Sequence, residues 1–351
     1  MRLLILSNMG PNKFNPSFGR FVYNQYAALK EKAPEDDIEY FYLKPFSSTS
    51  LFGSLLNKLK YPVFALVFFW RYIFSVKNLD IIHVHFYYPT ILLAWLYKKF
   101  RHPGVKLVVT FHGSDIYKYQ RPGRWYRRCL ANVDKVVFTS KTLKEKLAVK
   151  WTGDYDILSA GISDAFCMDE ARQSPRPVDV VFVGRLDDNK GKDRLLRLLE
   201  TSQKSLNVVV VGQGDGAWVD QFKQQTQHTV RYYASRSTDE LVSLFRQSKI
   251  LLSLSRHESF GLVMAEAMAC GCVVMATKTD GSVEQIDDQA NGVLLENCDN
   301  WLHENLANRV TSLLASDYFA SIQQAGQQSS QRYYLSDICD KLLLMYRNLI
   351  Y

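Results

Sequence analysis

Short apolar runs recur along this chain, separated by segments that are long enough to form a helix. The runs are rich in Val, Ile and Leu and lack a strict polar alternation, which is typical of strands covered on both faces of a parallel sheet. Strand and helix in repeated succession indicate an α/β, doubly wound architecture. We expect strands at Leu3–Leu6, Ile38–Leu43, Ile81–Val84, Leu107–Phe111, Val136–Thr139, Val178–Val183, Val208–Val211, Ile250–Ser253 and Val273–Ala276.

The 351 residues suit two cores better than one. The strand and helix repetition starts again after the Pro- and Ser-rich stretch Ala171–Pro177, where we place the linker. The predicted domains are residues 1–170 and 171–330, followed by a helical segment at 331–351. The apolar run in the first ten residues is too short for a secretory signal, so we expect a buried strand there.

Charge is distributed unevenly between the two halves. Residues 1–165 hold 24 Lys and Arg against 12 Asp and Glu, a balance of +12, and the whole chain has 43 against 35, which leaves −4 for the remainder. A basic first half indicates an anionic partner, either a membrane surface or a nucleic acid. The basic residues accompany no known nucleic-acid-binding module, which makes nucleic acid the weaker choice. The six cysteines show no CxxC pair, which favours reduced thiols in a cytoplasmic protein.

One segment, Tyr61–Val76, is almost wholly apolar and aromatic. It is too short to span a membrane, which needs roughly 20 apolar residues, and Arg71 interrupts it. Two interpretations stay open. The segment is either a helix buried against the first sheet, or an interfacial helix whose aromatic side chains lie among lipid headgroups while Lys58, Lys60 and Lys77 meet anionic lipid.

Two carboxylates lie eight residues apart after the strand Ile250–Ser253, at Glu258 and Glu266. We expect a turn followed by a helix that begins near Gly261, where a residue without a side chain permits close approach of a ligand. The unpaired N–H groups and the positive dipole end of a helix favour a diphosphate. Glu258 at the loop tip could then bind a sugar hydroxyl, and Glu266 a ribose diol. The alternative is that both carboxylates simply face solvent.

Two cations, Arg185 and Lys190, follow the strand Val178–Val183, and Gly184 stands between that strand and Arg185. Cations at a strand end can offset the charge that develops on a departing nucleoside diphosphate. Taken alone, they would more often be solvated loop residues. The adjacent acidic pair is not an Asp-x-Asp metal motif, so we expect no metal and no other cofactor.

The next strand ends in Gly212-Gln213-Gly214, which by itself predicts only a β-turn. In the first half, His112 follows the strand Leu107–Phe111, and strand ends of an α/β sheet are where ligands bind. His83 and His85 end another strand, but no third metal ligand is evident, which favours a packing or acceptor-side role.

The segment from Glu258 to Glu266 resembles the hallmark of the retaining glycosyltransferase family four, the group 1 glycosyltransferases, which has the form E-x-F-G-x-x-x-x-E. Phe260 and Gly261 complete it. The resemblance implies a GT-B fold, in which two Rossmann-like domains face a central cleft and the C-terminal helix packs back on the first domain. It implies that Glu258 contacts the donor sugar, that Glu266 holds the ribose, and that the backbone of Gly261, Leu262 and Val263 meets the diphosphate.

Other elements match the family in turn. The resemblance implies that Arg185 and Lys190, after Gly184, are diphosphate ligands, and that Gly212 and Gly214 lie near the base and ribose. The His-Gly-x-Asp turn that starts at His112 would face the donor sugar. Gly19, in the loop after the first strand, would lie near the diphosphate, although the family commonly has two adjacent glycines there.

The function that the resemblance implies is a retaining, metal-independent hexosyltransferase. It would move a sugar from a UDP- or GDP-linked donor to a lipid-linked or polysaccharide acceptor in cell-surface polysaccharide synthesis, such as lipopolysaccharide. The basic, aromatic first half favours a cytoplasmic protein that is peripheral on the inner face of the membrane. The alternatives are a sugar-nucleotide epimerase of the same fold and a non-catalytic module that binds glycans or nucleotide sugars.

Overall fold

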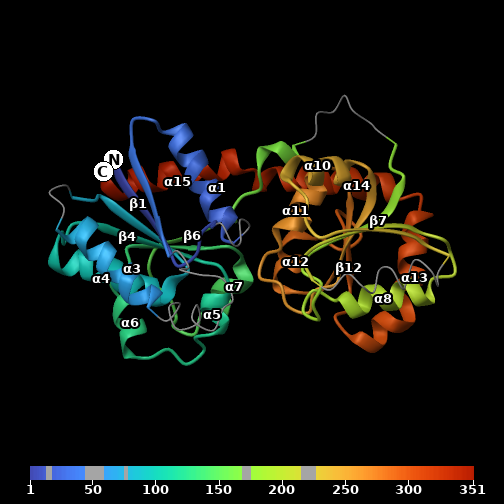
Figure 1. Cartoon of the computed structure of the whole chain (residues 1–351), viewed down its shortest axis with the longest axis horizontal. Helices are drawn as coiled ribbons and strands as arrows, with labels where there is room; N and C mark the ends of the chain where they lie inside the picture. The colour runs from blue at the N-terminus through green and yellow to red at the C-terminus, as the bar shows by residue number, and fades with distance from the viewer. Residues whose placement is uncertain (13–17, 44–58, 75–77, 168–174, 215–226) are drawn as a thin grey trace. The chain divides into compact units, whose positions relative to one another are not determined.

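The computed structural model describes residues 1–12, 18–43, 59–74, 78–167, 175–214 and 227–351 (Figure 1). The chain divides into two compact units, Met1–Gly161 with Leu335–Tyr351, and Ile162–Tyr334. The sequence prediction placed the boundaries at 170/171 and 330/331 instead, and most of the expected linker falls at 168–174, outside the described residues. Each unit is built on its own six-stranded parallel sheet.

The first unit has strand order β2-β1-β3-β4-β5-β6, with every neighbouring pair parallel. The direction in which successive strands are added changes between β1 and β3. The loops after these two neighbouring strands therefore leave the carboxyl end of the sheet in opposite directions. The strands are β1 (Arg2–Ser7), β2 (Asp37–Tyr42), β3 (Ile81–His85), β4 (Lys106–Phe111), β5 (Lys135–Phe138) and β6 (Tyr155–Ile157).

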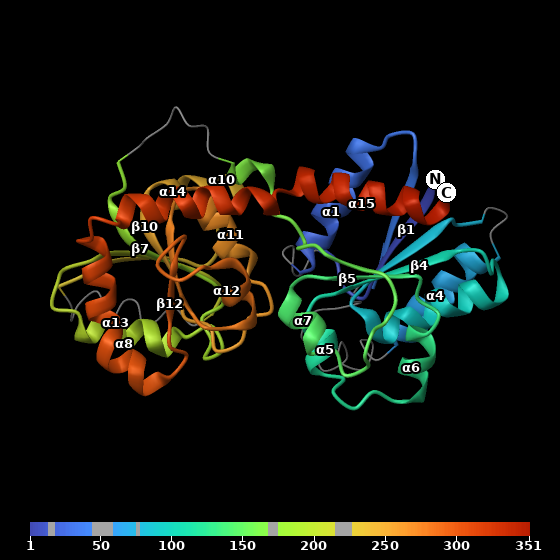
Figure 2. The same cartoon turned by 180° about the vertical axis from the view of Figure 1, so that it is seen from behind.

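Helices cover both faces of this sheet (Figures 1 and 2). Because side chains alternate along a strand, Leu4 and Leu6 pack into one core cluster while Leu3 and Ile5 pack into another. The first cluster includes residues of α3, α4 and α6, and the second includes residues of α1 and α15. The helices of this unit are α1 (Arg20–Lys32), α3 (Lys60–Phe68), α4 (Tyr87–Phe100), α5 (Ser114–Tyr117), α6 (Arg124–Leu130), α7 (Lys141–Glu145) and α15 (Leu335–Ile350).

The apolar segment is helical, as α3 followed by a π-helix, η1 (Phe69–Ile73). Phe64, Phe68 and Tyr72 point inward and pack around Phe41 of β2. The opposite side is exposed and equally apolar, with Leu66 at 69%, Trp70 at 79% and Phe74 at 73% exposure. Arg71 pairs with Glu39 at 2.7 Å. The interpretation as a helix packed against the first sheet is therefore confirmed for one face of the segment, whereas a membrane contact of the other face stays a prediction.

The second unit has strand order β12-β11-β10-β7-β8-β9, again all parallel. Renumbered within the unit, this is the 3-2-1-4-5-6 order of a doubly wound nucleotide-binding sheet. Its switch point lies between β7 and β10. The strands are β7 (Val178–Val183), β8 (Asn207–Val211), β9 (Thr229–Tyr233), β10 (Ser248–Ser253), β11 (Val273–Thr277) and β12 (Val293–Leu295).

Two core clusters flank this second sheet. One includes residues of α8, α13 and α14, and the other includes residues of α10 and α11. The helices are α8 (Lys192–Thr201), α10 (Thr238–Arg246), α11 (Leu262–Ala269), α12 (Asp280–Gln285), α13 (Asp299–Leu314) and α14 (Phe319–Ser330), with 3-10 turns η2 (Asp164–Phe166) and η3 (Gln331–Tyr333).

All predicted strands are present, with ends that differ by at most two residues, and the structure adds β6, β9 and β12. The C-terminal helix starts at Leu335 and not at residue 331, because Gln331–Tyr333 forms a 3-10 turn. Within the described part of the chain, no helix has the length and apolar character needed to cross a bilayer. All six cysteines lie among the described residues, and none of them forms a disulfide.

Candidate active site

The carboxyl ends of β7 and β10 lie side by side at the switch point of the second sheet. Loops that leave such a point in opposite directions open a crevice where α/β proteins bind ligands. The loop after β7 carries Gly184, Arg185 and Lys190, and the loop after β10 carries Glu258. The residues singled out from the sequence in this unit therefore come from adjacent strands.

Lys190 and Glu258 are joined directly, the Lys190 ammonium donating to the Glu258 carboxylate. Both side chains are mostly shielded, at 27% and 19% exposure. The backbone N–H of Lys190 donates to Asp187 at 2.9 Å, which fixes the turn before α8. The stem of Lys190 lies over Gly184, where an added Cβ would stand 3.6 Å from it. The structure thus brings together two of the residues predicted to bind the donor.

Gly191 explains why the two loops approach so closely. It has φ +78°, and a Cβ there would lie 2.3 Å from the carbonyl oxygen of Leu254. A backbone with this φ and this contact requires glycine. The start of α8 is therefore pressed against the end of β10.

Arg185 lies apart from this pair. Its side chain is 72% exposed and forms an ion pair with Asp187 at 3.0 Å. Asp187 therefore contacts both predicted cations, through its side chain to Arg185 and to the Lys190 backbone. Arg185 is therefore the exposed residue of this loop, at the rim of the site.

The helix α11 starts at the predicted place, with Gly261 at its N-cap in the left-handed region at φ +77°. A Cβ on Gly261 would stand 2.9 Å from the Cγ of Glu258. Leu262 and Val263 form the first turn, whose backbone N–H groups have no carbonyl in a preceding turn to bind. Phe260 is buried and meets the ring of Tyr333 edge-on at 5.2 Å. This arrangement presents backbone donors beside Glu258.

Glu266 lies on α11 one turn further on, within a helix whose other residues are largely buried. Burial raises the pKa of the Glu266 carboxyl from its ordinary value of 4.5 to about 7. A carboxyl with this pKa is held close to the point where it gains or loses its proton at neutral pH. Groups with such shifts cluster at functional sites.

The glycines after β8 are needed for packing between loops. A Cβ on Gly212 would stand 1.7 Å from the carbonyl oxygen of Gly184, and one on Gly214 would stand 2.6 Å from Leu186. The N–H of Leu186 donates to the carbonyl of Gln213 at 2.8 Å. The turn after β8 therefore supports the loop that carries Arg185 and Lys190.

Sequence reasoning missed the residues of α12 that hold the Glu258 loop. The N–H of Gly281 donates to the carbonyl of Glu258 at 2.9 Å, and the Gln285 amide donates to the carbonyl of Phe260. The capping box of α12, between Thr279 and Ser282, is readable as a helix start. The contacts of α12 with a loop more than twenty residues away cannot be read from the sequence in this way.

In the first unit, His112 directly follows β4 and forms a pair with His85, whose Nδ1 lies 3.0 Å from the His112 Nε2. The Asp115 carboxylate accepts the backbone N–H groups of His112 and Gly113, each at 3.0 Å, and that of Tyr87 at 3.1 Å. Asp115 thus fixes the turn and the start of α4. Burial raises the Asp115 pKa to about 6 and lowers the pKa of His112 well below its ordinary value.

His83 has a packing role in this unit, the one favoured from the sequence. Its Nδ1 lies 2.6 Å from the hydroxyl of Tyr346 on α15, and its Nε2 lies 2.7 Å from the hydroxyl of Thr110. Gly19 caps α1 with φ +64°, and a Cβ there would stand 2.9 Å from the Cγ of Met9. No cluster of three or more His, Cys, Asp or Glu suited to a metal occurs among the described residues.

Comparison with known families assigns both halves of the chain. The model of the family Glycosyl transferases group 1 matches residues 168–332, and that of Glycosyltransferase Family 4 matches residues 28–156. An uncharacterized glycosyltransferase of Methanocaldococcus jannaschii is 28% identical over 249 residues, which cover 68% of each chain. An uncharacterized 41.2 kDa protein in the cps region of Klebsiella pneumoniae is 25% identical over 328 residues, 86% of this chain and 84% of that protein.

The D-inositol 3-phosphate glycosyltransferase of Corynebacterium jeikeium is 37% identical over 131 residues, but these span only 34% of this chain and 31% of that enzyme. Among solved structures, Anabaena HepE in complex with UDP-glucose superposes with a TM-score of 0.69 at 18% identity, covering 99% of this chain and 100% of the other. With two parallel sheets, a complete Glu-x7-Glu motif and family matches over both halves, the chain belongs to the group 1, family four glycosyltransferases of GT-B fold.

Proposed function

We propose that this glycosyltransferase is a retaining, metal-independent hexosyltransferase that uses a UDP- or GDP-linked sugar and acts on a lipid-linked or polysaccharide acceptor of the cell surface. The observation that carries the donor site is the Lys190–Glu258 pair at the β7/β10 switch point, beside the first turn of α11. UDP-glucose in HepE favours UDP over GDP as the first base to test. The cps location of the Klebsiella relative supports a surface polysaccharide as the product.

In the proposed mechanism, the diphosphate binds at the N-terminus of α11 and takes the Lys190 ammonium from Glu258. Lys190 and the rim residue Arg185 then stabilise the negative charge that builds on the leaving nucleoside diphosphate, a contribution often worth several kcal/mol. Glu258, released from Lys190, accepts a hydroxyl of the donor sugar. Glu266 accepts the ribose hydroxyls. The bond between the anomeric carbon and the phosphate oxygen breaks, and the acceptor oxygen bonds to the anomeric carbon on the same face. The departing phosphate takes the acceptor proton, and the anomeric configuration is retained.

The proposed roles in the first unit belong to His112 and Gly19. His112, neutral because burial lowers its pKa, serves as a hydrogen-bonding partner of the sugar and not as an acid. Gly19 leaves room for the diphosphate at the start of α1. Neither role requires a metal, because the positive charge comes from Lys190 and Arg185.

The experiment is a donor panel of UDP-glucose, UDP-N-acetylglucosamine, GDP-mannose and ADP-glucose, incubated with the wild-type protein and EDTA. We expect slow release of one nucleoside diphosphate even without acceptor. If a donor is bound and is recovered with its sugar epimerised, the result would favour the epimerase alternative. Binding without any turnover, also when lipid-linked acceptors are supplied, would favour the non-catalytic module. With acceptor, the anomeric proton coupling of the product distinguishes retention from inversion.

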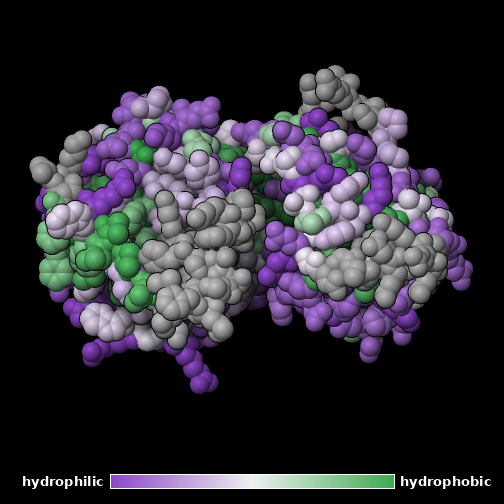
Figure 3. Space-filling view, in the orientation of Figure 1, coloured by the Kyte–Doolittle hydropathy of each residue, from purple (hydrophilic) through white to green (hydrophobic). Residues whose placement is uncertain are grey.

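The proposed membrane partner rests on the exposed face of α3 and η1. Leu66, Trp70 and Phe74 lie four residues apart and form one apolar stripe, and hydrophobic residues gather over α3 at the left of Figure 3. The helix η1 contacts α4, which contacts α6, and these helices add exposed Phe100 and Trp125. Such aromatic side chains suit the interface of a bilayer.

Cations accompany the aromatic side chains of the neighbouring helices α4 and α6, as an anionic membrane would require. Lys99 lies over the rings of Trp95 and Phe100, and Arg128 lies over those of Trp95 and Trp125. Lys60 starts α3, whereas Lys58 and Lys77 fall outside the described residues. Basic residues near an anionic surface contribute about 1 kcal/mol each. We propose that this face docks on the inner leaflet of the cell membrane.

Co-sedimentation with vesicles containing an anionic lipid tests the membrane proposal. The double variant Trp70→Ser, Phe74→Ser should shift protein from pellet to supernatant. Tyr318→Ser removes an aromatic side chain of similar exposure, 74%, from the other unit and should leave the partition unchanged. Equal recovery of the wild-type protein with and without vesicles would contradict the membrane proposal alone, since donor turnover is measured separately.

A further inference from the structure

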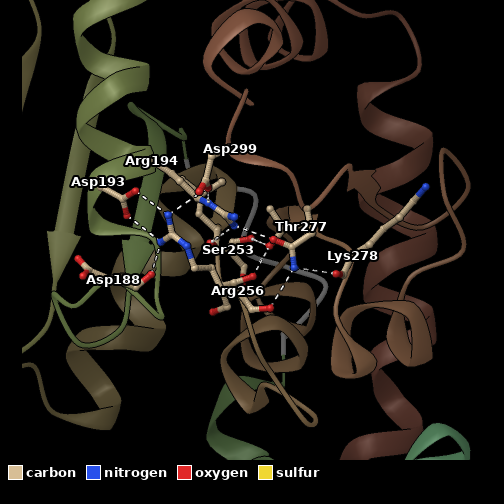
Figure 4. Close-up of polar contacts among 11 residues, drawn as sticks. Asp188, Asp193, Arg194, Ser253, Arg256, Thr277, Lys278 and Asp299 are labelled. Carbon is tan, nitrogen blue, oxygen red and sulfur yellow. Dashed lines mark hydrogen bonds and ion pairs between the residues drawn. The ribbon is translucent and has the colours of Figure 1, made fainter. Parts of the chain in front are cut away.

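Arg256 lies two residues before Glu258, and its side chain reaches the loop that carries Lys190 (Figure 4). The guanidinium binds both carboxylate oxygens of Asp193, at 2.9 and 2.7 Å, and also donates to the backbone carbonyl of Asp188. The backbone N–H of Arg256 donates to the carbonyl of Asn189 at 2.7 Å. Every one of these partners lies within three residues of Lys190.

A second arginine, Arg194, joins the same two segments (Figure 4). Arg194 is only 3% exposed and donates to the carbonyl of Leu254 at 2.9 Å and to the side chain of Asn297 at 2.8 Å. Asn297 in turn donates to the carbonyl of Arg256 at 3.0 Å. Asp299 accepts from Arg194 at 2.7 Å and from Arg256 at 3.0 Å. The cluster thus balances two cations with two anions, Asp193 and Asp299.

These contacts join two loops that are distant in the sequence. The loops after β7 and β10 belong to segments more than sixty residues apart, and Gly191 brings their backbones into direct contact at Leu254. A bidentate arginine–carboxylate pair has a fixed planar geometry, so it sets orientation as well as distance. The hydrogen bonds from Arg256 hold the pKa of Asp193 below its ordinary value, which keeps that pair charged.

We propose that Arg256 is a positioning residue for glycosyl transfer, which locks the Lys190 loop to the Glu258 loop so that Lys190 meets the diphosphate and Glu258 the sugar of one bound donor. This inference rests on the proposed donor role of Lys190 and Glu258. Arg256 is not itself assigned as a phosphate ligand, because both terminal nitrogens of its guanidinium are already bound to Asp193. It acts through Lys190.

A double-mutant cycle on donor affinity tests this inference. The probe is the donor selected by the panel, UDP-glucose or GDP-mannose, titrated by calorimetry against wild type, Arg256→Gln, Lys190→Ala and the double variant. We expect Arg256→Gln to weaken binding about tenfold, within the range of coupling between residues of one hydrogen-bond network. In the Lys190→Ala background the same substitution should change affinity by less than about twofold, since Lys190 is no longer there to be positioned.

Two further variants separate positioning from folding. Arg256→Lys keeps the charge but cannot form the bidentate pair, so its donor affinity should lie between those of the wild type and Arg256→Gln. Arg197→Gln removes an exposed arginine of α8 that pairs with its helix neighbour Glu200 at 3.2 Å, and should leave affinity unchanged. Thermal unfolding of each variant shows whether the fold is intact. If Arg256→Gln does not fold, Arg256→Lys and Asp193→Asn take its place in the cycle.

The outcomes distinguish this inference from the function on which it rests. Losses that add independently in the double variant, or an Arg256→Gln protein that binds donor as wild type does, would overturn the positioning role. If Lys190→Ala itself binds donor normally, the proposed donor site is wrong, and Arg256 then has no ligand to position. A loss of donor affinity on Arg256→Gln that occurs only when Lys190 is present supports both the positioning role and the proposed donor site.

Discussion

The raised pKa of Glu266 predicts that donor affinity increases with pH. If the ionised carboxylate accepts the ribose hydroxyls, the protonated form must lose its proton before it can bind. With a pKa of about 7, Glu266 is mostly protonated in weakly acidic solution. About one hundredth of the carboxyls are ionised two pH units below the pKa and about nine tenths one unit above it. Affinity should therefore rise nearly 100-fold, as an order of magnitude, from about pH 5 to about pH 8.

The assay is calorimetric titration with UDP-glucose, whose sugar-capped diphosphate lacks the phosphate ionisation near pH 6 that UDP itself has. The Cys270 thiol, which interacts electrostatically with Glu266, has a pKa of about 12 and stays neutral over this range. Glu266→Gln should bind with an affinity that is nearly independent of pH. Glu304→Gln, an exposed carboxylate of α13, should keep the wild-type slope. A wild-type affinity that is equal at pH 5.5 and pH 8 would refute the reasoning.

The same shift has a consequence for stability, with a definite sign. The folded state binds the Glu266 proton more tightly than the unfolded state, so this stabilisation is complete below pH 4.5 and is lost as pH rises through 7. The loss is at most about 3 kcal/mol, from 1.36 kcal/mol per pKa unit. Urea unfolding of the wild type against Glu266→Gln at several pH values measures it. A difference that does not vary with pH would show that Glu266 has an ordinary pKa.

Two further predictions follow from packing. Tyr346→Phe leaves the Nδ1 of His83 buried without its partner at 2.6 Å and should lower the free energy of unfolding by about 1–3 kcal/mol in urea; a change below about 0.5 kcal/mol would mean that this bond does not anchor α15. Gly191→Ala places a Cβ 2.3 Å from the carbonyl oxygen of Leu254 at φ +78°, so it should destabilise the protein by at least about 1 kcal/mol and weaken donor binding; wild-type affinity in this variant would show that the two loops can separate at no cost.

Much of the fold is predictable from the sequence because its central strands are buried on both faces. The run Val178–Val183 packs into core clusters on both sides of its sheet, which is why it reads as continuously apolar. The three strands that were missed, β6, β9 and β12, are all at sheet edges. An edge strand has only one neighbour, so β9 can expose Thr229 and Arg231 and lose the apolar pattern.

The candidate site also has a part that is predictable from the sequence and a part that is not. Glu258, Gly261 and Lys190 are predictable because each belongs to a local strand-turn-helix pattern that a diphosphate site requires. The contacts of Arg256 with Asp193, or of Gln285 with the Phe260 carbonyl, join segments that are distant in sequence. No local spacing encodes them. They depend on the strand order, which places the loops after β7 and β10 next to each other.

Donor turnover by the wild type, Glu258→Ala and Lys190→Ala in EDTA measures the central claim most directly. The claim is that the pair at the β7/β10 switch point, joined in the structure, is the donor site. We expect both variants to release nucleoside diphosphate at least about 100-fold more slowly than the wild type, the scale of losing one group that stabilises the transition state. Turnover at the wild-type rate in either variant, with the fold intact, would contradict it.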